Sequence, residues 1–161
     1  MNNSQGTINI MNCSKLESFS VSNSILNSVS ISNIAGKLKN FTLNNTHIRS
    51  IVLDCVEEGG SVSIVGDDTV EIITLSGFET VNINNCPKLK KVIFNIGSIA
   101  VKDITINNCN SVNVITSNTE ETGLVDLTTL TSLQYLDLQN CSSITSVKLP
   151  ANVILRDYGL A

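Results

Sequence analysis

Leu-Gln-Tyr-Leu-Asp-Leu-Gln-Asn-Cys, residues 133–141, contains the spacing apolar-x-x-apolar-x-apolar-x-x-Cys, and this spacing decides the fold. The same spacing recurs in residues 78–86 and 101–109. Three further segments match this spacing in part. Residues 8–13 match only its second half, and residues 26–34 match it with Ile34 in place of the cysteine. In residues 48–55 the cysteine, Cys55, comes one position earlier than in the other copies. Such self-similarity at a fixed spacing is the signature of a repeat protein.

A second set of segments alternates with the first and has the same apolar spacing without the terminal cysteine. It covers residues 16–21, 38–43, 89–94 and 144–149. In the regular parts of the chain, each coil contains one segment of either set and has a length of about 22 residues, within the range of known solenoid repeats. In an apolar-x-apolar triplet the outer side chains point to one side and the middle one to the other. Stacked coils therefore form parallel strands on two faces around an aliphatic core.

The composition agrees with this prediction. Asn, Ser and Thr supply about a third of the residues, whereas charged residues make up 15% and aromatic residues 4%. A chain this rich in Ile, Val and Leu is not disordered, and Ser, Thr, Asn, Val and Ile are mediocre helix formers. We therefore predict a β-rich solenoid with little helix. Residues 1–161 form a single solenoid domain, which is either complete or a piece of a longer repeat array.

Two coils are predicted to be longer and irregular. Equivalent positions in these coils lie further apart than the length of one regular coil. The excess is more than a third of that length both from Ile51 to Val81 and from Ile104 to Leu136. The extra residues fall around 57–69 and 117–129, which are polar stretches containing glycine and much of the acidic charge. Insertions on one face of a solenoid have this character.

Asparagine and cysteine recur at fixed places after the first set of triplets. Asparagine suits the bend where a strand ends, because it tolerates left-handed and turn conformations. Cysteine in the next position behaves as a small inward-facing hydrophobe, and Ile34 in that position favours packing over metal binding or redox chemistry. The predicted structural repeat positions are Asn12, Cys13, Asn33, Ile34, Cys55, Asn85, Cys86, Asn108, Cys109, Asn140 and Cys141.

Residues 130–141 resemble the leucine-rich-repeat consensus, Leu-x-x-Leu-x-Leu-x-x-Asn/Cys. The alternating second strand, and cysteine where many families have asparagine, are similar to bacterial BspA-like proteins and other short irregular repeats. The resemblance implies a right-handed solenoid with leucine-rich-repeat-like coils, and a role in protein recognition or adhesion. The chain departs from that pattern in three ways: Ile and Val replace most leucines, coil lengths vary, and the sequence shows no obvious polar cap.

Charge and hydropathy exclude several classes of partner. The formal net charge is −4, and the densest basic group, Lys88, Lys90 and Lys91 with Lys102 nearby, is interpreted as a solvated turn. We therefore expect no nucleic acid partner. No apolar run approaches the roughly 18 residues of a membrane span. The first residues do not form a signal peptide, which leaves open a cytoplasmic protein, a virion-associated protein or a fragment of a surface protein.

The chain shows no convincing catalytic or metal site. Asp67, Asp68 and Glu71 form the densest carboxylate group, and His47 is the single histidine. We interpret the acidic pair and His47 as turn residues, and a calcium site at the pair is the less favoured alternative because its spacing fits no EF-hand. The cysteines lack zinc-ligand spacing, and their odd number argues against a disulfide framework. We expect no cofactor, no small-molecule ligand and no enzymatic activity.

We expect a partner to contact the larger outward residues and the acidic pair, because interfaces favour tyrosine and disfavour serine. The candidates are Ile93, Tyr135, Asp137, Gln139, Lys148, Asp67 and Asp68. The leading hypothesis is a non-catalytic leucine-rich-repeat module for protein binding or surface recognition. The alternative is a self-associating structural solenoid, the building block of a larger assembly such as a phage virion or a bacterial surface appendage. A solenoid hydrolase ranks third.

Overall fold

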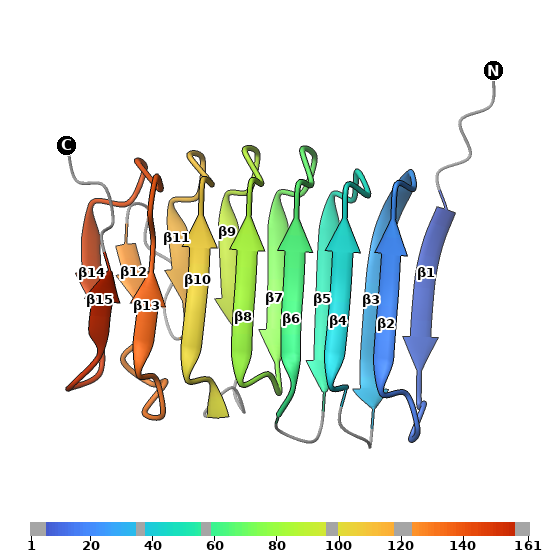
Figure 1. The fold of residues 1–161 in the computed structure, drawn as a ribbon, viewed down its shortest axis with the longest axis horizontal. Helices are drawn as coiled ribbons and strands as arrows, with labels where there is room; N and C mark the ends of the chain where they lie inside the picture. The colour runs from blue at the N-terminus through green and yellow to red at the C-terminus, as the bar shows by residue number, and fades with distance from the viewer. Residues whose placement is uncertain (1–5, 35–37, 56–58, 96–99, 118–123, 157–161) are drawn as a thin grey trace.

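The computed structural model describes residues 6–34, 38–55, 59–95, 100–117 and 124–156 of the 161-residue chain. These residues form a parallel β-solenoid whose strands lie in two layers, sheet A and sheet B (Figure 1). Sheet A contains, in spatial order, β1 (Gly6–Met11), β3 (Leu26–Ile34), β5 (Ser50–Cys55), β7 (Ile72–Ser76), β9 (Lys91–Phe94), β11 (Val114–Thr116), β12 (Leu124–Asp126) and β14 (Ser146–Lys148). Sheet B contains β2 (Ser18–Ser22), β4 (Asn40–Asn44), β6 (Ser61–Val65), β8 (Thr80–Asn84), β10 (Asp103–Asn107), β13 (Tyr135–Asp137) and β15 (Ile154–Arg156).

The chain alternates between the two sheets, so that a regular coil contributes one strand to each. In sheet A, Val29, Ile51 and Ile73 are paired neighbours, each one coil after the last. All strand pairs in the described residues are parallel, and those residues contain no helix that is long and apolar enough to cross a membrane. The predicted β-rich solenoid and the length of its regular coils are confirmed.

The core lies between the sheets and runs along the solenoid. In β6, Val62 and Ile64 are buried while the serines beside them are partly exposed. This alternation follows from the two-residue period of a strand, and it places the small polar residues on the outer faces. Each fully buried Val, Leu, Ile or Phe contributes about 1.5–3 kcal/mol, so the stacked aliphatic residues hold successive coils together.

The predicted insertion between Ile51 and Val81 is wrong. The chain instead forms an additional regular strand, β7, in which Ile73 and Leu75 are buried. Ile73 pairs with Ile51 on one side and with Val92 on the other. Residues 59–69, expected as part of an inserted loop, contain β6 and the turn that leads to β7.

The additional strand changes the sheet to which later strands belong. Successive strands alternate between the two sheets. A prediction that omits β7 therefore assigns the strands that follow it to the opposite sheet. Val81, Ile104 and Leu136 therefore lie in sheet B, although the sequence groups them with the earlier strands of sheet A. Val92 and Val147 lie in sheet A.

The second predicted long coil is confirmed. Ile104 of β10 pairs directly with Leu136 of β13, although more than one regular coil of sequence separates them. Between them, β11 and β12 both lie in sheet A and pair with each other. Among the described strands, the insertion therefore gives sheet A one strand that has no counterpart in sheet B.

The strands of sheet B end at a column of residues with left-handed backbone conformation. The column comprises Asn23 (φ 50°), Asn45 (φ 53°), Gly66 (φ 68°), Asn85 (φ 56°), Asn108 (φ 55°) and Asn140 (φ 57°). Asparagine and glycine are the residues that adopt this conformation at least cost. The side-chain amides also bond from coil to coil: Asn45 Nδ2 donates to Asn23 Oδ1 at 3.1 Å, and Asn140 Nδ2 donates to Asn108 Oδ1 at 2.7 Å.

The predicted asparagine positions do not all belong to this column. Asn85, Asn108 and Asn140 do, whereas Asn12, with a φ of 58°, follows β1 in sheet A. The prediction of a single column is therefore wrong for Asn12. The side chains of Asn33, Ile34 and Cys55 lie outside the described part of the structure.

Candidate functional site

An aspartate occupies a buried position at the turn after β6. The residue that follows each member of the left-handed column forms a second column, which comprises Ser24, Thr46, Asp67, Cys86, Cys109 and Cys141. Its members are buried except for the half-buried Ser24, and Asp67 is only 1% exposed. The candidate partner-binding role of Asp67 is therefore wrong, because its carboxylate does not reach the surface.

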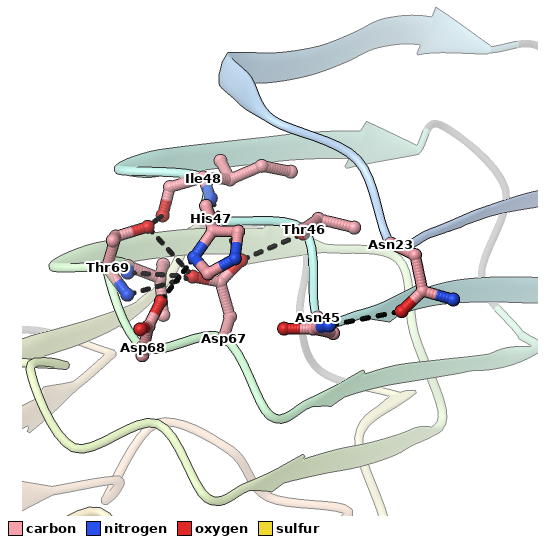
Figure 2. A network of polar contacts seen from close by, with 9 residues as sticks. Asn23, Asn45, Thr46, His47, Ile48, Asp67, Asp68 and Thr69 are labelled. Atoms are coloured by element: carbon pink, nitrogen blue, oxygen red, sulfur yellow. Dashed lines mark hydrogen bonds and ion pairs between the residues drawn. The ribbon is translucent and has the colours of Figure 1, made fainter.

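The Asp67 carboxylate joins two coils through hydrogen bonds (Figure 2). Its Oδ2 accepts from Thr46 Oγ1 at 2.8 Å and from the Ile48 amide at 3.0 Å, both in the preceding coil. Its Oδ1 accepts from the Val70 amide at 3.0 Å, and from the Thr69 amide and hydroxyl, each at 3.1 Å. A buried carboxylate is tolerated only when it is well bonded, and here both oxygens are used by the turn itself.

Asp68 and His47 form an exposed pair beside this buried carboxylate. His47 Nδ1 lies 2.5 Å from Asp68 Oδ1, and the two side chains are 39% and 60% exposed. His47 has a φ of 52°, and its imidazole lies toward the next coil, where Asp68 is placed (Figure 2). A shallow pocket of about 140 Å³ opens at this place and is lined by Leu26, Asn27, His47, Arg49 and Thr69.

Three charged residues continue from the pocket along the solenoid. Glu71 lies between Arg49, whose Nε is 3.8 Å from Glu71 Oε1, and Lys90, whose Nζ is 2.9 Å from Glu71 Oε2. The hydrogen bond and charge of Lys90 lower the pKa of Glu71, and Arg49 adds to this effect. Together with His47 and Asp68, these three residues are named the charged corner.

The hydroxyl and carboxylate groups beside the pocket are bonded within the turn. The hydroxyls of Thr46 and Thr69 both bond to Asp67, and Thr69 Oγ1 also lies 3.1 Å from the Ile48 carbonyl oxygen, although Thr69 and His47 line the same pocket. Calcium requires six to eight oxygen ligands, and the oxygens of Asp67 are already occupied by five donors. Among the described residues, no group of three His, Cys, Asp or Glu side chains is placed to hold a metal ion.

The basic residues near Lys88 do not form one stripe. Lys90 bonds to Glu71 beside sheet A, whereas Lys102 bonds to Glu79 at 2.7 Å beside sheet B. The bond to Glu79 raises the pKa of Lys102. These pairs connect successive coils and neutralise much of the local positive charge.

Three cysteines extend the buried column beyond Asp67. Cys86, Cys109 and Cys141 are fully buried free thiols, and the Cys141 thiol donates to the Ile106 carbonyl at 3.0 Å. The hydrogen bond with Cys86, together with burial, raises the pKa of Cys109, and burial raises the pKa of Cys141 to about 11. The hydrogen bond with Cys109 lowers the pKa of Cys86, and the three thiols pack in the core. Cys13 lies beyond the end of β1 and is exposed, so the prediction that it faces inward is wrong.

The predicted partner-binding residues are divided between the two sheets. Ile93 and Lys148 lie in sheet A, whereas Tyr135 and Asp137 lie in sheet B. Asp137 is 6% exposed and accepts hydrogen bonds from Tyr135 Oη at 3.4 Å and from the Gln139 amide at 3.2 Å. The structure therefore brings Tyr135, Asp137 and Gln139 together but places the other two residues elsewhere.

The apolar side chains of the two end coils are less buried than those of the central coils. The inward side chains of the central strands are buried, but those of β1, β2, β14 and β15 are only partly buried. The affected apolar residues include Ile8, Phe19, Val147 and Leu155. Exposed large apolar residues also occur at both ends, with Met11 56%, Ile25 62% and Ile154 67% exposed.

Comparisons of the chain with protein-family models, with curated proteins and with solved structures find no match.

Proposed function

We propose that the protein is a structural building block that assembles end to end through its two end coils. The observation that carries this proposal is the incomplete burial of inward apolar residues in β1, β2, β14 and β15, whereas between these strands the described inward residues are buried except for Leu26 at the start of β3. In a solenoid each coil is stabilised by its neighbours, and a coil that has a neighbour on one side only exposes core surface on the other.

The edges of the sheets support the same function. Among the strands that the structure describes, β1 and β2 each pair on one side only, and so do β14 and β15. Edge strands present unpaired backbone N–H and C=O groups and readily pair with another chain. Contact at these edges would bury apolar side chains and satisfy backbone groups together, which is how the internal coils of this protein are stabilised.

The proposal predicts that Ile154→Lys weakens self-association. Ile154 lies on the outer side of the edge strand β15, so contact with a second copy would bury only part of its side chain. Full burial of a large aliphatic side chain contributes about 1.5–3 kcal/mol, and for partial burial we expect association to require about three- to tenfold more protein. Sedimentation equilibrium over a range of concentrations measures the change.

Ile72→Lys is the matched control for this variant. Ile72 is also an exposed isoleucine in a strand, at 42% exposure, but it lies in β7, between the two ends. The control should associate like the parent chain. Equal effects of the two substitutions, or a parent chain that remains monomeric at about 1 mM, would contradict the proposal.

A recognition module of the leucine-rich-repeat kind is the second candidate, and the charged corner is the observation that favours it. Most of the outer surface consists of Ser, Thr and Asn, whereas the corner combines a pocket with exposed His47 and Arg49. Charged surface groups of this kind steer a partner and select it more than they add affinity. A strictly monomeric chain would favour this function over assembly.

A further inference from the structure

We infer that the assembly contact joins two copies of this chain head to tail, with β14 and β15 of one copy paired in parallel with β1 and β2 of the next. The inference rests on the proposed function, since it specifies the partner and the register of the same end coils. Both sheets are extended at once in this arrangement, because β1 and β14 are the two edges of sheet A, and β2 and β15 are the two edges of sheet B.

The internal strand pairs give the register of the contact. In sheet A, the inward residues Ile8 and Val29 are paired at one end, and Val125 and Val147 at the other. Continuing the same register places Val147 of one copy beside Ile8 of the next. The outward residues that follow them, Lys148 and Asn9, are then neighbours as well.

The strand pairs of sheet B indicate the same head-to-tail register. Phe19 pairs with Phe41, and their rings stack with centroids 5.2 Å apart, while Leu136 pairs with Leu155 at the other end. Translation by one coil places Leu155 of one copy on Phe19 of the next. The contact would thus cover the outer face of the Phe19 ring, opposite to the face that Phe41 covers.

Charge favours this polarity over contact between two C-terminal ends. The described residues of β14 and β15 include Lys148 and Arg156, and both are exposed. A two-fold contact of these ends would gather four cations at one junction, with their strand-pair partners Asp126 and Asp137 lying one strand further in. In the head-to-tail register, Lys148 faces Asn9 and Arg156 faces Ser20, which are neutral. Because a head-to-tail contact leaves one free end of each kind, copies add without closing into a dimer.

Chemical cross-linking tests the register. In a background that carries Cys13→Ser and Cys55→Ser, Asn9→Cys and Lys148→Cys introduce thiols on exposed outward positions of β1 and β14. The strands in which they lie are at opposite ends of the molecule, so the two thiols cannot be joined within one copy (Figure 1). Neighbouring strands lie about 4.8 Å apart, within reach of a short bismaleimide. We expect the double variant to give dimers, trimers and longer species on a denaturing gel, and each single variant to remain monomeric, like the chain that carries only the two serine substitutions.

The outcomes separate this inference from the proposed function. Dimers formed by either single variant, with no longer species from the double variant, would show a two-fold contact and overturn the head-to-tail register. Association in sedimentation without any cross-linked product would overturn the register while leaving end-to-end assembly in place. No association at any concentration would overturn both.

Discussion

Replacing Asp67 with alanine is expected to lower the free energy of unfolding by about 3–5 kcal/mol, because buried hydrogen-bond donors lose their acceptor. The donors are the Thr46 and Thr69 hydroxyls and the amides of Ile48, Thr69 and Val70. An unsatisfied buried donor costs about 1–3 kcal/mol, and water can reach only those near the surface. Urea unfolding followed by circular dichroism measures the loss.

Asp68→Ala is the matched control, because it removes the adjacent carboxylate. Asp68 is 60% exposed and bonds only to His47 among the contacts that the structure describes. Exposed ion pairs contribute about 0–1 kcal/mol, so this variant should unfold close to the parent chain. Similar losses for the two variants would show that Asp67 does not join the coils as described.

Gly60→Ala is expected to destabilise the protein by about 3–5 kcal/mol, which corresponds to a fall in melting temperature of roughly 10 °C or more. Gly60 has a φ of 86°, a conformation that residues with a Cβ rarely adopt. A Cβ at this position would overlap the Leu38 carbonyl oxygen and lie 2.8 Å from the Lys39 Cα. Both contacts are with backbone atoms, so the neighbouring coil itself would have to move.

Gly66→Ala separates the steric effect from the conformational one. Gly66 also has a positive φ, of 68°, but a Cβ there would meet only Asn44 Oδ1 at 3.9 Å. We expect a loss of about 1–2 kcal/mol from the left-handed conformation alone, and Gly66→Asn should be nearly neutral because asparagine occupies the equivalent turns. Thermal unfolding compares the variants. Equal losses for Gly60→Ala and Gly66→Ala would contradict the close approach at Gly60.

The repeat spacing in the sequence is sufficient to predict the solenoid, its inward apolar residues and its asparagine turns. The sequence pattern does not predict the strand β7, and the reason is physical. Val70, Ile73 and Leu75 follow the same apolar spacing as the other copies, but Gly66, Asp67 and Asp68 precede them where other copies have asparagine and cysteine. A charged residue in a buried position looks like a loop in sequence, and only the donors that surround Asp67 explain how it is accommodated.

The partner surface could not be predicted because it depends on which sheet each strand joins. The candidate residues share only an outward position and a large side chain, and Ile93 and Tyr135 lie in different sheets. The buried thiols could be assigned from spacing, but the exposed Cys13 could not, because burial differs between end coils and central coils. Exposure at the ends is a property of the folded stack that no local pattern contains.

Hydrogen exchange of the backbone amides at low and high protein concentration tests the central claim most directly. Local opening governs exchange, and frayed ends exchange faster than the interior. The account predicts that raising the concentration slows exchange in β1, β2, β14 and β15 while β5 to β8 stay unchanged. Exchange that is independent of concentration at both ends, or protection confined to the charged corner, would contradict assembly through the end coils.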